Sequence, residues 1–380
     1  MKTILTTSIA AMLASAAFAT DHIGAQPVTD INTLGDSNPD NVSFSNDRLY
    51  FTATDKNGKR GIYAKKLVRG PLAAADPVLN RKPAKIKNLT TRGVTKAVNN
   101  FVRAFEVNIA DKMFFHVVGD GLFTTKGSAL STIRVLKFNA GAPDGDAANA
   151  YDPQVTPYFL GDNNFTMGVI FAGQGKNTGV EPFVSNGKPG KGTHIVKDIN
   201  PGAGHSFPYG FLARPSGIFP DQIFFGAFDP VNFYQCHVTT AETEATTGRI
   251  GGVNVSSTES LNANLATFPH AFALAGNDVM FAAENAPGDL VRDVGLFKTS
   301  DSTFEFLTNA DVDPFFFTYG TGTEVFFNGL DAATGRELWV GSGFGEFAQV
   351  HDDIVAGTGS SSPHLFHTFT DGQNTSVPVP

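Results

Sequence analysis

The chain has 380 residues, a formal net charge of −8 and only 17% charged residues, and it contains 40 Gly, 21 Pro and 35 Phe. This composition is typical of many short strands joined by tight turns, so we expect an all-β fold. The acidic balance disfavours nucleic acid and anionic membranes as partners, because both are bound by clustered Lys and Arg.

The first residues are predicted to be a targeting signal. Lys2 precedes an apolar run from Ile4 to Ala17 that is too short to cross a bilayer, and Ala17 and Ala19 form an Ala-x-Ala cleavage pattern. We therefore assign 1–19 to a signal peptide and 20–380 to one mature domain that is secreted or periplasmic. No later run reaches the roughly 18 apolar residues of a membrane helix, so we expect no membrane insertion.

Six apolar triplets that end in Phe return along the mature chain at intervals of 46 to 64 residues. They are Leu49-Tyr50-Phe51, Met113-Phe114-Phe115, Val169-Ile170-Phe171, Ile223-Phe224-Phe225, Val279-Met280-Phe281 and Val325-Phe326-Phe327. Self-similarity at such an interval is typical of a repeated unit of four short strands.

Glycine and proline mark the other strands of each repeat. A Gly opens a second strand after five of the triplets, at Gly61, Gly121, Gly179, Gly295 and Gly335. In the fourth repeat Phe233-Tyr234 stands at this place, so we expect a remodelled hairpin there. A Pro, which suits the first residue of a strand, precedes the apolar run of most units: Pro39, Pro153, Pro208, Pro269, Pro314 and Pro363.

Two segments resemble the ELWxxDGT repeat of secreted and surface-associated proteins. They are Arg336-Glu337-Leu338-Trp339 and the run from Gly192 to Pro208, and the weaker resemblance extends from Pro27 to Phe369. The resemblance implies a β-propeller-type fold outside the cytoplasm. It implies no catalytic residues.

The repeat is expected to close into a ring, because a lone four-stranded unit would expose two apolar faces and its edges. The N-terminal segment Val28–Asn32 and the C-terminal segments His364–Phe369 and Thr375–Val379 together supply one more unit. We therefore predict an all-β propeller of seven blades, the last shared between the termini, with six blades as the alternative. The lone Cys236 makes no internal disulfide, so packing must hold the ring.

Equivalent positions of successive blades converge at one mouth of a propeller. The residues that follow each repeat Pro are Asp40, Gln154, Tyr209, His270, Phe315 and His364. Among them His270, His364, Tyr209 and Asp40 are candidates for acid–base catalysis or metal binding. The alternative is a ring of polar side chains solvated by ordered water.

Acidic turns are weaker candidates for a Ca²⁺ site. Asp55, Asn57, Asp144 and Asp146 place oxygen ligands in Gly-containing turns, but neither turn completes a specific calcium loop. Ordinary Asx turns explain the same residues.

The leading functional prediction is a binding or scaffolding module at the cell surface or in the extracellular matrix, with a glycan or protein as its partner. The alternative is an extracellular polysaccharide lyase or hydrolase with its site at the axial mouth. His and Tyr in the predicted mouth would serve as base and acid.

Overall fold

A computed structural model describes parts of the chain between Ile31 and Val379. The described ranges are 31–45, 48–66, 83–91, 94–95, 98–106, 109–117, 120–137, 156–159, 167–175, 177–216, 219–231, 233–240, 243–244, 249–250, 255–257, 269–284, 292–298, 303–308, 311–318, 324–342, 349–352, 354–361, 367–370 and 376–379. The chain forms two compact units, one of Met1–Phe101 with Thr125–Thr132 and one of Val102–Thr124 with Ile133–Pro380. The predicted signal peptide lies outside the described residues.

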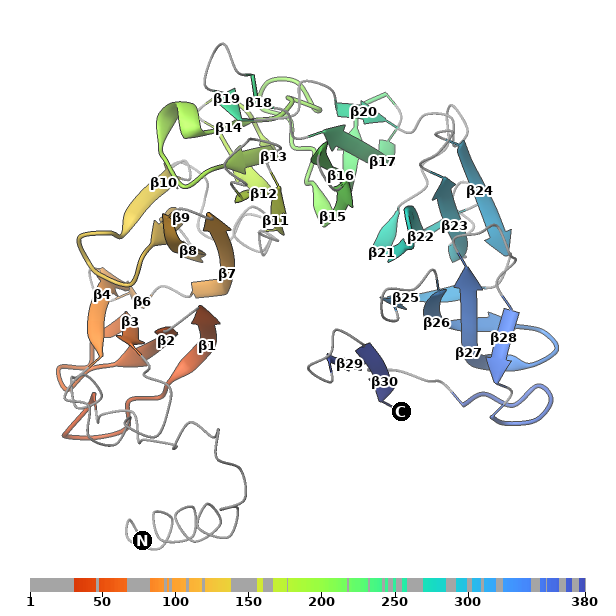
Figure 1. Cartoon of the computed structure of the whole chain (residues 1–380), viewed down its shortest axis with the longest axis horizontal. Coiled ribbons are helices and arrows are strands. Elements are labelled where there is room, and N and C mark those ends of the chain that lie inside the picture. The colour runs from red at the N-terminus through yellow and green to blue at the C-terminus, as the bar shows by residue number, and fades with distance from the viewer. Residues whose placement is uncertain are drawn as a thin grey trace, which may run out of the picture. The chain divides into compact units, whose positions relative to one another are not determined.

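Within the described ranges, six four-stranded antiparallel sheets follow one another along the chain, which confirms the all-β class (Figure 1). Sheet 1 contains β1 (Asp40–Ser45), β2 (Arg48–Thr54), β3 (Arg60–Lys66) and β4 (Ala84–Asn88). Sheet 2 contains β7 (Val98–Glu106), β8 (Ile109–Val117), β9 (Gly121–Thr125) and β10 (Ile133–Lys137). Sheet 3 contains β11 (Thr156–Phe159), β12 (Met167–Gln174), β13 (Val180–Ser185) and β14 (Thr193–Ile195).

The remaining sheets have the same order of strands. Sheet 4 contains β15 (Tyr209–Ser216), β16 (Phe219–Asp229), β17 (Phe233–Thr240) and β20 (Val255–Ser257). Sheet 5 contains β21 (His270–Ala275), β22 (Asp278–Glu284), β23 (Arg292–Lys298) and β24 (Thr303–Thr308). Sheet 6 contains β25 (Asp311–Thr318), β26 (Glu324–Asp331), β27 (Gly335–Ser342) and β28 (Gln349–Asp352).

Short elements complete the described fold. Three two-stranded ladders pair β5 (Thr90–Thr91) with β6 (Val94–Thr95), β18 (Thr243–Glu244) with β19 (Arg249–Ile250), and β29 (His367–Thr370) with β30 (Ser376–Val379). The 3₁₀ turn η2 spans Gly190–Gly192. Within the described ranges, no helix is long and apolar enough to cross a membrane.

The six triplets occupy the second strand of each sheet, and Gly61, Gly121, Gly179 and Gly335 lie within one residue of the start of a third strand, as predicted. The prediction was wrong for Gly295, which lies in the middle of β23 and pairs with Phe281. In five sheets the final Phe stacks or tilts against an aromatic ring of the third strand. These pairs, with centroid separations of 5.5 to 6.2 Å, are Phe51–Tyr63, Phe115–Phe123, Phe171–Phe183, Phe225–His237 and Phe327–Trp339. Cross-strand aromatic pairs of this kind stabilise neighbouring strands.

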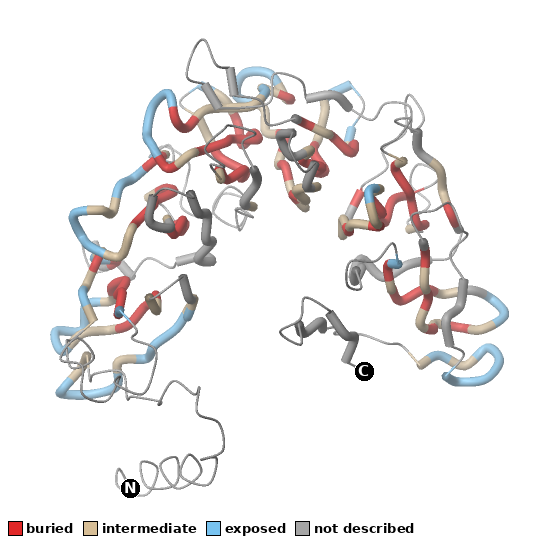
Figure 2. The backbone as a smooth tube through the Cα atoms, viewed as in Figure 1, coloured by how far each residue is buried: buried red, intermediate tan, exposed pale blue. Residues whose placement is uncertain are grey.

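Successive triplet residues face opposite sides of a sheet, which explains why the repeat needs two adjacent apolar residues. Phe225 packs in a cluster with Ile170 of sheet 3, whereas its neighbour Phe224 packs with Phe281 of sheet 5. The same alternation links sheet 2 to sheet 3 and sheet 5 to sheet 6. Burial is accordingly concentrated in the second and third strands (Figure 2). Each such Phe contributes about 1.5 to 3 kcal/mol.

In three sheets the first strand begins directly after the repeat Pro, as predicted. The second residue after Pro39, Pro208 and Pro269 has a left-handed backbone, with φ of 50°, 67° and 51°, and the register of the strand shifts there. Such a shift marks a β-bulge. The prediction was wrong for Pro314, which lies inside β25 rather than at its start, and the register shift between Val312 and Phe316 accommodates it.

Within the second unit the first strands lie beside one another, because β11 contacts β15, β15 contacts β21 and β21 contacts β25. This is the neighbour relation that radial stacking requires. Closure of the sheets into one ring, and with it the number of blades, stays a prediction. Two C-terminal strands were predicted, at His364–Phe369 and Thr375–Val379. The hairpin β29–β30 lies close to these segments and confirms a pair of strands there. Ile31 and Asn32 lie outside any strand, and Val28–Asp30 lie outside the described residues.

Candidate functional site

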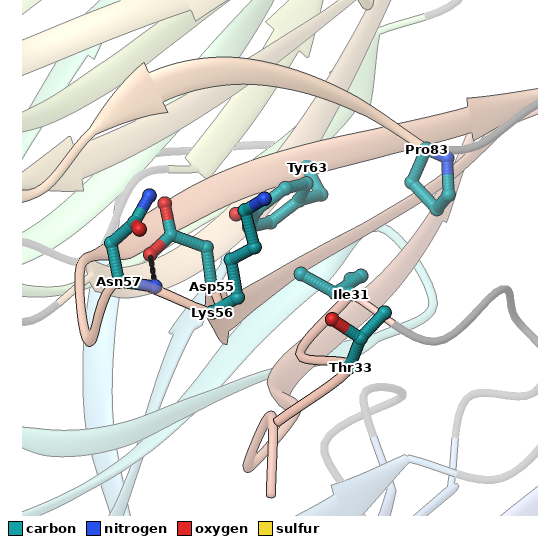
Figure 3. Close-up of a pocket in the computed structure, with 7 residues that line it drawn as sticks. All are labelled: Ile31, Thr33, Asp55, Lys56, Asn57, Tyr63 and Pro83. Carbon is teal, nitrogen blue, oxygen red and sulfur yellow. Dashed lines mark hydrogen bonds between the residues drawn. The ribbon is translucent and has the colours of Figure 1, made fainter. Parts of the chain in front are cut away.

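A pocket of about 260 Å³ opens on sheet 1 beside the β2–β3 turn (Figure 3). It is lined by Ile31, Thr33, Asp55, Lys56, Asn57, Tyr63 and Pro83, which come from the segment before β1, the turn, β3 and the residue directly before β4. Thr33, Lys56 and Asn57 are exposed, whereas Tyr63 is only 4% exposed. The pocket therefore combines a buried aromatic residue with polar groups that a ligand can reach.

The Asp55 carboxylate organises the turn at this pocket. Its Oδ1 accepts hydrogen bonds from the backbone N–H groups of Asn57 and Lys59, both at 2.9 Å. Lys85 on β4 donates to Oδ2 at 3.0 Å. Gly58 has φ of 71°, a conformation that favours glycine and is common in hairpin turns. These contacts are those of an Asx turn, and a calcium-binding role for Asp55 and Asn57 stays a prediction.

The same contacts set the charges around the pocket. Partial burial acts to raise the pKa of Asp55, but the N–H groups of Lys59 and Asn57 together with the Lys85 ammonium outweigh burial and lower it. Burial and then the Asp55 charge raise the pKa of the Tyr63 hydroxyl. Lys85 Nζ lies 5.8 Å from the Tyr63 ring centroid, and Phe51 stacks against the same ring. The Tyr63 hydroxyl therefore stays neutral at physiological pH, beside the ionised Asp55 carboxylate.

The second pair of calcium candidates, Asp144 and Asp146, lies outside the described residues. In the part of the chain that the structure describes, no group of three or more His, Cys, Asp or Glu is placed to hold a metal ion.

Three candidates for the axial mouth occupy equivalent positions, as predicted. Asp40 pairs with Thr52, Tyr209 with Gly226 and His270 with Ala282, and each partner directly follows the final Phe of a triplet. The side chain of His270 lies outside the described residues, as do the side chain of Phe315 and all of Gln154 and His364. Their convergence at one mouth stays a prediction.

The two described side chains of this set contact their own sheets. Asp40 is exposed, accepts the Asn41 N–H at 2.7 Å and lies 3.7 Å from the Arg60 guanidinium. The Tyr209 ring packs over Gly226 and lies 6.2 Å from the Tyr234 ring. A β-carbon at Gly226 would overlap the Tyr209 ring, so glycine at this position makes room for it.

Sequence reasoning missed a buried carboxylate in sheet 3. Glu181 on β13 is fully buried, and its Oε2 accepts the Ile199 N–H at 2.9 Å and the Ser206 hydroxyl at 2.7 Å. Its Oε1 accepts the Ser206 N–H at 3.1 Å. These bonds fix the loop that leads from sheet 3 to the first strand of sheet 4.

Sheet 6 contains the same arrangement. Glu337 Oε2 accepts the Ile354 N–H at 3.2 Å and the Ser361 hydroxyl at 2.5 Å, and Oε1 accepts the Ser361 N–H at 3.0 Å. We call each arrangement a Glu–Ser latch, formed by Glu181 with the loop Ile199–Ser206 and by Glu337 with the loop Ile354–Ser361. The sequence signal is a Glu two residues before the aromatic residue of the third strand, followed 24 or 25 residues later by Ser-x-Pro.

Comparisons with known proteins give no family. No family model and no curated protein matches the chain. Among solved structures it is similar to an oligogalacturonate lyase in complex with manganese, at 13% identity and a TM-score of 0.40 over 84% of this chain and 76% of that one.

Two further structures are similar at the same low level. TolB from Acinetobacter baumannii has 10% identity and a TM-score of 0.34, over 81% of this chain and 77% of that one. A puromycin hydrolase mutant has 11% identity and a TM-score of 0.33 over 95% of this chain, which spans 61% of the hydrolase. Similarity this weak carries no argument about function.

Proposed function

We propose that the chain is a secreted or periplasmic β-propeller that acts as a binding or scaffolding module, and that the pocket on sheet 1 contacts a sugar residue of an extracellular glycan. The observation that carries the proposal is the pocket itself. Its exposed Thr33, Lys56 and Asn57 side chains offer a hydroxyl, an ammonium and an amide beside the buried Tyr63 ring. Binding sites for small ligands typically combine an apolar wall with a small number of well-placed polar groups.

The repeat supports the propeller part of the proposal. Sheets 2 to 6 pack in chain order through shared apolar clusters, and the first strands from sheet 3 to sheet 6 adjoin. The resemblance to the ELWxxDGT repeat adds an extracytoplasmic setting. Glu337 and Trp339 of the resembling segment have structural roles, in the latch and in the aromatic pair of sheet 6.

The polysaccharide lyase or hydrolase stays an alternative prediction. Of its four proposed catalytic residues, the structure describes only the side chains of Asp40 and Tyr209, and each packs on its own sheet.

Glycan binding is tested with a glycan array, followed by calorimetric titration of the tightest oligosaccharide. The double variant Lys56→Ala, Asn57→Ala should weaken binding by about tenfold or more, because it removes two hydrogen-bonding groups worth about 1 kcal/mol each. The fold should survive, since both side chains are exposed and the turn is held by Asp55. Lys191→Ala, which removes an exposed lysine of η2, is the matched control and should bind like the wild type. Equal affinity of the double variant and the wild type would contradict the proposal.

A further inference from the structure

The two Glu–Ser latches are built alike down to their backbone. Gly202 and Gly357 have φ of 78° and 80° at matching places in the two loops. A β-carbon at Gly179 or at Gly335 would overlap a carbonyl of the loop, from Gly204 or Gly359 respectively. The two latches therefore share one backbone geometry, so the chemical surroundings of their two carboxylates can be compared directly.

The surroundings of the two carboxylates differ. Ile199, which donates to Glu181, is 5% exposed and belongs to the apolar cluster shared by sheets 3 and 4. Ile354, which donates to Glu337, is 59% exposed. Both carboxylates are fully buried, so the difference lies in the loops that cover them: the loop over Glu181 packs into an apolar cluster through Ile199, whereas the loop over Glu337 exposes Ile354 to water.

Burial decides the protonation of Glu181. It raises the pKa of Glu181 to about 7, in opposition to the hydrogen bonds from Ser206 and Ile199, and the negative charge of Asp198 acts in the same direction as burial. For Glu337 the Ser361 hydroxyl outweighs desolvation, and further N–H donors help it to lower the pKa. The two copies consequently differ in the sign of their pKa shift.

A proton on Glu181 fits the hydrogen bonds of the closed loop. The protonated Oε2 donates to Ser206 Oγ at 2.7 Å, and that hydroxyl donates to the Val180 carbonyl at 3.2 Å. The Ile199 and Ser206 N–H groups still have a carboxyl oxygen to donate to. Loss of the proton puts a charge in an apolar cluster beside Asp198, which is unfavourable.

We propose that the sheet 3 latch is a pH-sensitive switch: the loop Ile199–Ser206 is held closed with Glu181 protonated and loosens when Glu181 ionises, whereas the sheet 6 latch stays closed. The switch acts on the junction between two sheets. The Ser206 carbonyl accepts the Phe228 N–H at 2.7 Å, and Tyr209 starts β15 three residues later. Opening of the loop therefore frees the start of sheet 4.

The direction of the pH effect follows from linkage. Glu181 has a higher pKa in the closed loop than in an open, solvated one, so the closed loop loses stability as the pH rises through the open-state value of 4.5 toward 7. His205 also faces this loop, and its Nδ1 accepts the Val180 N–H at 2.9 Å.

Hydrogen exchange measured by mass spectrometry tests the switch in the full chain. Between pH 6 and pH 9, after correction for intrinsic exchange, protection of the peptide that covers Ile199–Ser206 should fall by about tenfold. In Glu181→Gln, which mimics the protonated acid, this dependence should vanish. The matched variant Glu337→Gln should leave it intact, and protection of Ile354–Ser361 should not fall in the wild type.

Two results would overturn the proposal. One is equal protection of Ile199–Ser206 at pH 6 and pH 9 in the wild type, and the other is an unchanged loss of protection in Glu181→Gln. Should Glu181→Gln not fold, the carboxyl ¹³C resonance of Glu181 in the wild type gives the answer. A midpoint near 7 supports the switch, and a midpoint below about 5 rejects it.

Discussion

His116 is a buried histidine directly after the triplet Phe of sheet 2, and it is 2% exposed. Burial lowers its pKa to about 4, so the imidazole is neutral in the folded state. Between pH 6.5 and pH 4 the unfolded chain binds a proton that the folded chain does not, so stability falls as the pH falls. From pH 7 to pH 5 the loss should be about 2 kcal/mol.

Urea unfolding at the two pH values measures this effect. His116→Gln keeps a polar side chain but cannot titrate, so its loss of stability between pH 7 and pH 5 should be smaller than that of the wild type by about 2 kcal/mol. If the wild type and the variant lose the same stability, His116 is not the neutral buried group inferred here.

At the residue scale, local chemistry was predictable from the sequence and long-range chemistry was not. The turn at Asp55 follows from Asp, Asn and Gly at neighbouring positions, since an Asx turn uses bonds within a few residues. The Asp55–Lys85 ion pair and the Glu181–Ser206 bond span 30 and 25 residues. Spacing alone does not show which distant donor meets which carboxylate.

At the scale of the element, each latch needs a glycine where the third strand meets the loop. Gly179→Ala should lower the free energy of unfolding by about 1 to 3 kcal/mol, because its β-carbon would overlap the Gly204 carbonyl, which is backbone and has little room to move. Gly35→Ala is the matched control, since its β-carbon would meet only the Asn32 side chain at 3.4 Å.

Chemical denaturation of the two variants checks this prediction. The Gly179→Ala midpoint should move to lower denaturant, and the Gly35→Ala midpoint should stay close to the wild type. Equal midpoints for both variants would mean that the Gly204 backbone moves away from the added β-carbon at little cost. The loop would then be more easily deformed than its hydrogen bonds indicate.

The strands themselves were largely predictable, because a strand buried on both faces needs consecutive apolar residues. All six triplets lie in second strands, and alternate members pack toward different sheets. Strand starts were less predictable. Pro314 looks like the other repeat prolines, but β25 begins at Asp311, and only the register shift after Val312 accounts for a proline inside the strand.

At the scale of the whole molecule, closure of the ring is the prediction that separates seven blades from six. Ile31 and Asn32 lie outside any strand, so in a shared seventh blade Val28–Asp30 would be the part of the N-terminal segment that pairs with the C-terminal strand. Neighbouring strands lie about 4.8 Å apart. Cysteines on paired strands at that spacing meet the distance requirement of a disulfide. Cys236 is the single cysteine and is buried, so Cys236→Ala gives a background in which only introduced thiols react.

The experiment places one cysteine at Asp30 and a second, in turn, at each position from Thr375 to Val379, in the chain that starts at Thr20. Mild oxidation should cross-link at least one pair, seen as a faster band on a non-reducing gel. The control pair joins Asp30 to Ile133 on β10 of sheet 2, which a seven-bladed ring separates from the last blade by sheet 1. Cross-linking of a C-terminal pair but not of the control supports seven blades. If no C-terminal position reacts, the ends do not share a sheet, and β29–β30 is an additional edge on a six-bladed ring or on an open stack.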